Sequence, residues 1–216
     1  MDTVTTIERA IEERSLLTHP FYTKWVAGTL PIDAIRDYAR QYYAFESSFP
    51  RFLSAIHSRC QDRATRQMLL DNLWDEEHGR ENHAELWLRF AEGVGVTREE
   101  VLAAAPNTAT QALVETYRRT ATEEAVVAGV AAIHAYERQV PDVATAKIDG
   151  LRRHYGVADE RTLAFWEIHR ALDVAHAEAE RRILGDLAAS DPGTAQAATE
   201  EALDAWWAFL SAVDPV

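Results

Sequence analysis

The sequence contains very little cysteine and lysine, and it has no long apolar run. Cys60 is the only cysteine among 216 residues, so an internal disulfide is excluded and a reducing, cytoplasmic location is expected. No apolar run approaches the roughly 20 residues that a membrane-spanning helix needs. The acidic, amphipathic start (Met1–Ser15) resembles neither a signal peptide nor a transit peptide. These absences argue against a secreted or membrane-spanning protein.

Acidic residues outnumber basic ones, and the formal net charge is −13. Such a charge repels nucleic acid phosphates and anionic lipid surfaces, so neither is expected as a partner. Small molecules are expected instead. The hydrophobic fraction of 47% is ordinary for a globular protein. A chain of this length can form one domain, here residues 1–216, that buries about 70% of its unfolded surface.

Apolar residues recur at helical spacing along nearly the whole chain, and no segment alternates like a strand. The longest predicted helices span residues 32–59, with a kink at Pro50, then 62–91 and 159–187. Thr97–Glu100 has the pattern of a capping box, which begins a short helix. The predicted fold is therefore all-α, a single bundle of seven to nine helices.

Two segments place acidic and imidazole side chains at helical spacing. Glu76 and His83 are nearly two turns apart, so on one continuous helix both side chains would point the same way. His169, Asp173 and His176 follow at spacings of four and three residues, which forms one stripe on a second helix. A solvated helix face can show the same pattern, so each segment alone is weak evidence for a ligand set.

Glu137 is the sixth candidate ligand. It follows an apolar run (Val126–Ile133) that should lie in the core, so Glu137 is expected to be buried as well. Buried carboxylates and imidazoles are costly unless they are paired or bind a cation. Three carboxylates bring three negative charges, which two divalent cations nearly neutralise. Helix bundles build dimetal centres from such inward-facing side chains, and mixed oxygen and nitrogen ligands suit iron or manganese, with zinc possible. The pattern therefore predicts a two-metal site.

The chain resembles the haem-oxygenase-like dimetal oxidases, a family with a seven-helix bundle fold. The resemblance runs from His19-Pro20-Phe21-Tyr22 to the helix that carries His169, and the other matching stretches are 37–43, 49–51, 72–87, 135–139 and 147–151. Within the family the greatest likeness is to a bacterial group that makes p-aminobenzoate for folate biosynthesis. The resemblance implies a diiron or manganese–iron pair, O2 as co-substrate and an external reductant. Bundles of this kind often form homodimers, so a homodimer is expected.

Members of this group are thought to consume their own side chains. By its place in His-Pro-Phe-Tyr, Tyr22 matches the sacrificed tyrosine, and by its place in Lys-Ile-x-Gly-Leu, Lys147 matches the amino donor. Tyr136 and Tyr38 match two further functional tyrosines. Each has an ordinary alternative: the tyrosines can pack in the core, and Lys147 can be solvated. Since arginine is strongly preferred over lysine elsewhere in the chain, a lysine at this place favours the functional interpretation.

Three other functions remain open. The same dimetal centre could oxidise an exogenous fatty acid, amine or amino acid. A metal-free enzyme on the same fold, such as a thiamine-salvage hydrolase, would need a nucleophilic cysteine, but Cys60 has no obvious activating neighbour in the sequence. A helical interaction module would have little reason to place six ligand-type residues in its core.

Overall fold

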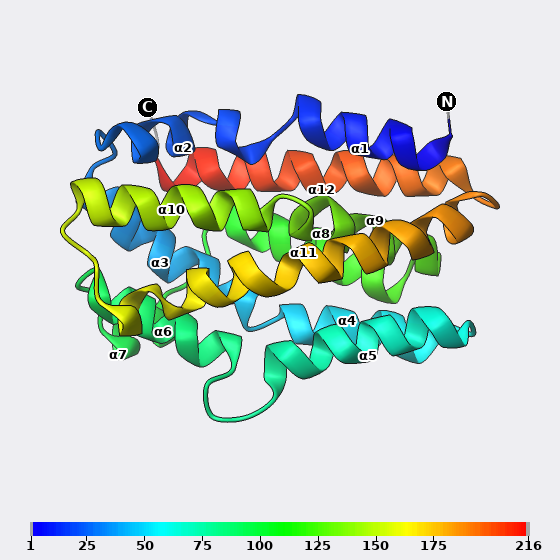
Figure 1. Cartoon of the computed structure of the whole chain (residues 1–216), viewed down its shortest axis with the longest axis horizontal. Coiled ribbons are helices and arrows are strands. Elements are labelled where there is room, and N and C mark those ends of the chain that lie inside the picture. Colours follow the sequence, from blue (N-terminus) through cyan, green and yellow to red (C-terminus); the bar gives the residue numbers. More distant parts are fainter. Residues whose placement is uncertain (1, 215–216) are drawn as a thin grey trace.

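The computed structural model describes residues 2–214, which contain twelve α-helices, one short 3-10 helix and no strand (Figure 1). In chain order they are α1 (Thr3–Glu13), η1 (Leu16–Thr18), α2 (Pro20–Ala27), α3 (Ile32–Glu46), α4 (Phe49–Arg59), α5 (Arg63–Glu77), α6 (His83–Gly93), α7 (Arg98–Ala103), α8 (Thr108–Thr122), α9 (Val126–Glu137), α10 (Val140–His154), α11 (Glu160–Ala188) and α12 (Pro192–Val213). The predicted all-α class is confirmed.

Helix α9 lies at the centre of the bundle, where α4, α8, α11 and α12 pack around it. Its residues are mostly apolar or small, and all of those from Val127 to Glu137 are buried. A helix that is hydrophobic all round can be stable only inside a protein. Glu137 therefore ends a helix that is buried over nearly its full length.

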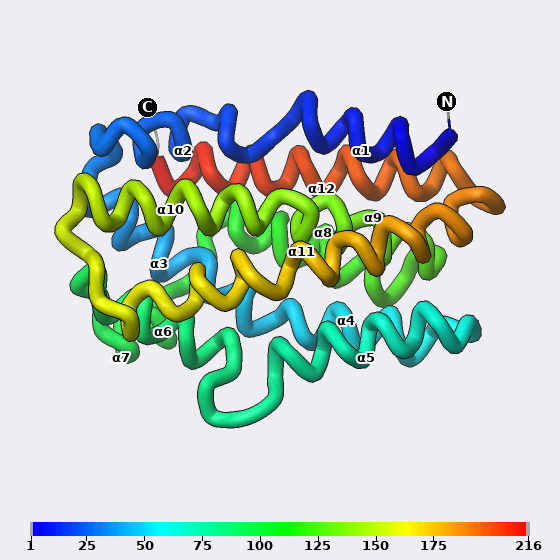
Figure 2. The backbone as a smooth tube through the Cα atoms, viewed as in Figure 1, coloured from blue at the N-terminus to red at the C-terminus, as the bar shows by residue number. Residues whose placement is uncertain are grey.

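The long helix α11 crosses the bundle and packs against α5, α6, α9 and α10. The tube in Figure 2 follows α11 from the end of the molecule near α6 and α7 towards the start of α12, which returns beside α1. Trp206 on α12 is buried in the core. The middle of α11, which carries the predicted ligand stripe, consequently faces several other helices.

Two predicted helices are interrupted. The helix expected over 62–91 ends at Glu77, and a new one begins at His83. Gly79 adopts a φ of +85°, which glycine tolerates best, and the Asn82 side chain accepts a hydrogen bond from the Glu85 amide at 3.0 Å and caps α6. The prediction of one continuous helix was wrong because this N-cap was not recognised.

The helix expected over 32–59 is also divided. Helix α3 ends at Glu46, and Pro50 lies in the first turn of α4, so the proline follows a break instead of kinking a continuous helix. In contrast, the predicted capping box is confirmed, because Thr97 and Glu100 each accept a hydrogen bond from the other's backbone amide.

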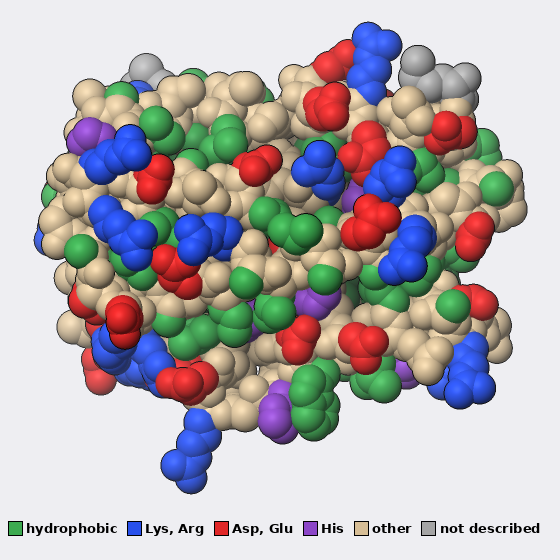
Figure 3. All heavy atoms as spheres, viewed as in Figure 1, with side chains coloured by type: hydrophobic (Ala, Val, Ile, Leu, Met, Phe, Trp, Pro, Cys, Tyr) green, Lys and Arg blue, Asp and Glu red, His purple; other side chains and the backbone are tan. Residues whose placement is uncertain are grey.

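The surface is mixed in charge. On the face drawn in Figure 3, acidic and basic side chains lie among one another and form no large region of one sign. Within residues 2–214, none of the helices combines the length and the apolar character needed to cross a membrane.

Candidate metal centre

The six predicted ligands come from four helices. Glu76 lies at the end of α5, His83 begins α6, Glu137 ends α9, and the 169–176 stripe lies in the middle of α11. All are buried except His176, whose side chain is 12% exposed. Glu76 and His83 do not share a helix as predicted, yet the loop between α5 and α6 still turns them toward one another. Glu76 and His83 are therefore brought together by a loop and not, as their spacing suggested, by a shared helix face.

Glu76, His83 and His169 form the tightest group. Each offers one ligand atom, and these atoms lie within 4.8 Å of one another. Nδ1 of His83 is 2.8 Å from Oε2 of Glu76, although the two are not aligned as a hydrogen bond. Nδ1 of His169 donates to the Phe165 carbonyl at 2.8 Å, which leaves Nε2 free to bind a metal. This group can hold one cation.

Glu137, Asp173 and His176 lie on the other side of the same interior. The Asn72 side-chain amide donates to both Glu137 oxygens, at 2.9 and 3.0 Å. Nε2 of His176 is 3.0 Å from an Asp75 carboxylate oxygen, and its Nδ1 is 3.7 Å from Asp173. Asp75 thus orients a candidate ligand.

Many polar atoms in this interior have no hydrogen-bond partner. They are Glu46 Oε1, Glu76 Oε2, both ring nitrogens of His83, Asp173 Oδ2, His176 Nδ1 and both carboxylate oxygens of Glu180. Unpartnered buried polar atoms are rare in native proteins, because each loses its hydration without replacement. A donor set of carboxylate oxygens and imidazole nitrogens is suited to binding iron or manganese.

The pKa shifts have the same cause. Burial, followed by the charge of Glu180, raises the pKa of Glu137 well above its usual value. Burial also raises the pKa of Asp173 to about 6. Burial opposes protonation of His83, but the carboxylates of Glu76, Glu46 and Asp173 together outweigh it, and the pKa of His83 rises to about 9. These groups are crowded with negative charge, which a cation among them would neutralise.

Sequence reasoning missed two buried carboxylates. Glu46 on α3 lies near Glu76 and His83, and burial together with the Glu76 charge raises its pKa well above the usual value. Glu180 on α11 lies beside Glu137, and burial raises its pKa to about 8. Glu180 extends the predicted stripe by four residues from His176, so the helical period could have revealed it. Glu46 had no such signal.

The Lys147 side chain is buried in an aromatic pocket. Its Nζ lies 3.8 Å from the centroid of the Trp166 ring, 4.1 Å from that of Tyr38 and 5.3 Å from that of Tyr22. Nζ also donates a hydrogen bond to the Tyr38 hydroxyl. Burial alone lowers its pKa well below 10.5, since no carboxylate among the described residues opposes the shift. The solvated alternative for Lys147 is therefore wrong.

The four tyrosines that line this interior form a continuous series. Tyr22 contributes a buried ring, and a hydrogen bond from Tyr38 partly offsets the effect of burial on its raised pKa. The rings of Tyr38 and Tyr42 lie 5.4 Å apart, and the hydroxyls of Tyr42 and Tyr136 share a hydrogen bond. Burial, followed by the charge of Glu46, raises the pKa of Tyr136 well above its usual value. Tyr42, which the sequence did not single out, joins the lysine pocket to the acidic cluster.

A helix bundle with carboxylates and imidazoles turned into its core is typical of metal-binding oxidases. Residues 36–209 match the family Haem_oxygenas_2, described as iron-containing redox enzyme, and the chain belongs to this family. The predicted resemblance to haem-oxygenase-like proteins is thereby confirmed.

Several curated relatives are similar over nearly the whole chain. A protein of Chlamydia trachomatis named 4-aminobenzoate synthase is 40% identical over 97% of this chain and 91% of its own length. One of Nitrosomonas europaea with the same name is 38% identical over 96% and 89%. A pyrroloquinoline-quinone synthase of Ruegeria pomeroyi is 30% identical over 68% and 62%.

The solved structures that match support the fold. A TenA homologue of Pseudomonas syringae superposes with a TM-score of 0.86 at 15% identity, covering 98% of this chain and 92% of the other. A CADD-like protein of unknown function from Nostoc punctiforme gives a TM-score of 0.75 at 18% identity, covering 98% and 100%.

Proposed function

We propose that this chain is an oxygen-dependent dimetal oxidase that forms 4-aminobenzoate, with Tyr22 as the source of the ring and Lys147 as the source of the nitrogen. The observation that carries the proposal is the position of the Lys147 amine, 5.3 Å from the Tyr22 ring centroid in a buried pocket. The names of the relatives that are about 40% identical support the product.

The pocket suits an amine that acts as a nucleophile. A protonated amine has no lone pair to give, and burial shifts Lys147 toward its neutral form. The hydrogen bond to the Tyr38 hydroxyl fixes the direction of Nζ, and the Trp166 ring closes the opposite side. Aromatic walls also exclude water, which would compete for a reactive ring.

The series from Tyr22 through Tyr38 and Tyr42 to Tyr136 supports oxidation of Tyr22 at a distance. Oxidising a phenol removes electrons, so the Tyr22 ring needs an electron path to the oxidant. The adjacent tyrosine rings offer that path, and the Tyr38 hydroxyl donates a hydrogen bond to Tyr22.

The residues that would hold two cations are the six predicted ligands, with the Glu76, His83 and His169 group as one position. A pair of iron ions, or manganese and iron, would supply the redox capacity to reduce O2 with electrons from an external reductant. The Phe165 carbonyl fixes the ring of His169, Asp75 fixes that of His176, and Asn72 fixes the Glu137 carboxylate. These contacts hold the donor atoms in place before any cation binds.

Two alternatives are less well supported. Oxidation of an exogenous substrate by the same centre does not account for a buried lysine beside Tyr22. A thiamine-salvage activity would require a reactive cysteine, whereas the Cys60 thiol is buried and donates to the Asp62 carbonyl at 3.6 Å. The proposed homodimer and cytoplasmic location are expectations of the same proposal.

Isotope labelling tests the source of the nitrogen. The chain has two lysines, Lys24 and Lys147, so protein labelled with ε-15N-lysine carries the label at two known positions. After metal loading and O2 addition, we expect 15N-labelled 4-aminobenzoate from the wild type and from Lys24→Arg, and no product from Lys147→Arg. Unlabelled product from labelled wild-type protein would contradict the assignment of Lys147.

Tyr22→Phe tests the source of the ring. This variant keeps the ring and its packing but lacks the phenolic hydroxyl, so we expect no product while the metal content stays at the wild-type level. Product formation at the wild-type level would remove Tyr22 from the proposal and favour an exogenous substrate. Repeated turnover per chain would have the same consequence.

A further inference from the structure

Glu180 is a buried carboxylate that the six-ligand site leaves unexplained. It lies on α11, one turn after His176, and only 1% of it is exposed. Neither of its carboxylate oxygens has a hydrogen-bond partner. An isolated carboxylate in such a place would lose its hydration and gain nothing in return.

Glu180 lies beside another carboxylate, Glu137. Glu137 lies within hydrogen-bonding reach of Glu180, and both of its oxygens already accept from the side-chain amide nitrogen of Asn72. Asp173, two turns earlier on α11, adds a third negative group with one unpartnered oxygen. Three carboxylates that lie near one another in a buried interior need a cation or shared protons, and their oxygens are the ligands that iron and manganese accept.

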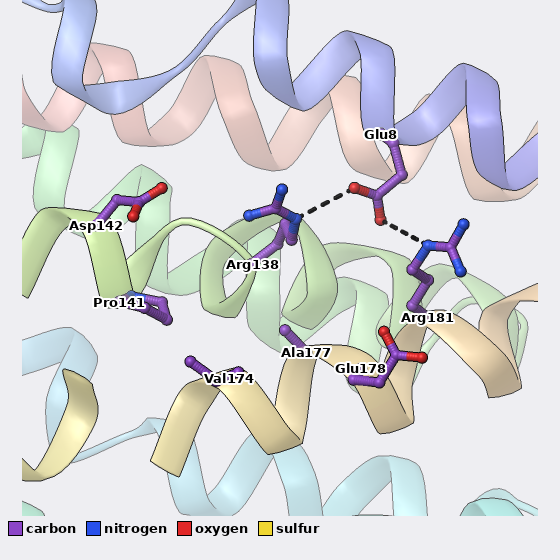
Figure 4. A pocket seen from close by; sticks show the side chains of 8 residues that line it. All are labelled: Glu8, Arg138, Pro141, Asp142, Val174, Ala177, Glu178 and Arg181. Carbon is purple, nitrogen blue, oxygen red and sulfur yellow. Dashed lines mark hydrogen bonds and ion pairs between the residues drawn. The ribbon is translucent and has the colours of Figure 1, made fainter. Parts of the chain in front are cut away.

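A chain of side chains holds Glu180 from its outer side. Nδ1 of His134 lies 3.4 Å from a Glu180 oxygen, and its Nε2 is 2.8 Å from Glu8. In Figure 4, Glu8 stands between Arg138 and Arg181 above a surface hollow of about 480 Å³, and it is 3.2 and 3.7 Å from their side-chain nitrogens. His134 is itself fully buried.

We propose that Glu180 is a further metal-binding residue, which together with Glu137 and Asp173 holds the second of two divalent cations. The inference rests on the proposed dimetal function and adds a ligand to it. His134 acts as a positioning residue, because it reaches Glu180 with one nitrogen and the anchored Glu8 with the other. The Glu76, His83 and His169 group would hold the first cation without Glu180.

The test is an anaerobic titration of the metal-free protein with Mn(II), which needs no turnover. We expect two ions per wild-type chain and an exchange-coupled electron paramagnetic resonance signal. In Glu180→Gln, the weaker ion should bind at least 10-fold less tightly and the coupled signal should disappear, while the tighter ion is retained. Glu178→Gln removes an exposed carboxylate from the same helix and should titrate like the wild type.

The outcomes separate the two proposals. If the wild type binds two ions and Glu180→Gln binds them with unchanged affinity and signal, Glu180 is not a ligand and the dimetal function stands. If the wild type binds fewer than two, both proposals are overturned. Glu180→Asp is a second test in case Glu180→Gln does not fold, because it keeps the carboxylate but its side chain is one methylene shorter. Without metal, Glu180→Asp should have the same melting temperature as the wild type. Addition of Mn(II) should raise its melting temperature by less than that of the wild type, and an equal rise would contradict metal binding by Glu180.

Discussion

Two adjoining regions of the core bury ionisable side chains in opposite ways. Around Lys147, one amine lies among aromatic rings, and no carboxylate among the described residues contributes to its shifted pKa. On the far side of Tyr42, five carboxylates are buried near imidazoles, namely Glu46, Glu76, Glu137, Asp173 and Glu180. The first region favours a neutral amine, whereas the second accumulates charge.

The difference indicates what each region is built to receive. A neutral amine can be buried at modest cost, because it leaves no charge to solvate. A group of carboxylates cannot be neutral at the same pH unless most are protonated, so it favours cations. The lysine pocket is filled by the chain's own side chains, whereas the acidic region would be stabilised by bound cations. Substitutions in the acidic region should therefore change metal binding, whereas substitutions in the lysine pocket should change how stability depends on pH.

The largest effect is expected from removing a ligand of the tight group. In His83→Ala, one of three converging donors is lost, so we expect the affinity for Mn(II) or Fe(II) to fall by about 100-fold or more. Equilibrium dialysis with elemental analysis measures this directly. His78→Ala is the matched control, because His78 is exposed and stacks on Trp74, so its affinity should stay within about 2-fold of the wild type. Equal losses in both variants would show that the effect is not ligation.

The next effect concerns pH and the lysine pocket. The pKa of Lys147 is lowered in the folded chain, so the unfolded chain binds more protons between that value and 10.5, and stability rises with pH across this window. Lys147→Met removes this dependence. As pH rises from 7 to 9, we expect the free energy of unfolding of the wild type to increase relative to that of the variant, by up to about 1.4 kcal/mol per pH unit.

Urea denaturation of both proteins without metal at each pH measures the difference. Lys24→Met is the control, because Lys24 is partly exposed and pairs with Asp214, so its removal should change the slope much less. A slope that is the same in the wild type and Lys147→Met would mean that the lysine is charged in the folded chain.

The sequence predicted the helical class and the burial of most of the candidate site, for identifiable reasons. The stripe of His169, Asp173 and His176 lies within one uninterrupted helix, so its spacing alone places the three on one side. Glu137 follows an apolar run whose burial is readable from composition. Glu46 was not predictable, because α3 and the Glu76 region meet only in three dimensions.

The pair of Glu76 and His83 shows where reasoning from spacing fails. Two residues seven apart face the same way on a helix, but here a loop with Gly79 at positive φ separates them. They still approach to 2.8 Å, because the loop places the end of α5 beside the start of α6. Loop geometry depends on a few local dihedral angles, and helical periodicity carries no information about them.

The smallest effect therefore concerns this loop. Gly79→Ala forces a side chain into a left-handed conformation, although nothing lies within 4 Å of the added carbon, so we expect a loss of about 1–2 kcal/mol from backbone strain alone. Gly156→Ala is the control, because its φ of +68° and open surroundings are similar while it lies outside the α5–α6 loop. Thermal unfolding should show similar losses for both variants. Only Gly79→Ala should also weaken metal binding several-fold, since relief of its strain displaces Glu76 relative to His83; identical metal titrations for the two variants would mean that the loop does not set the distance between these ligands.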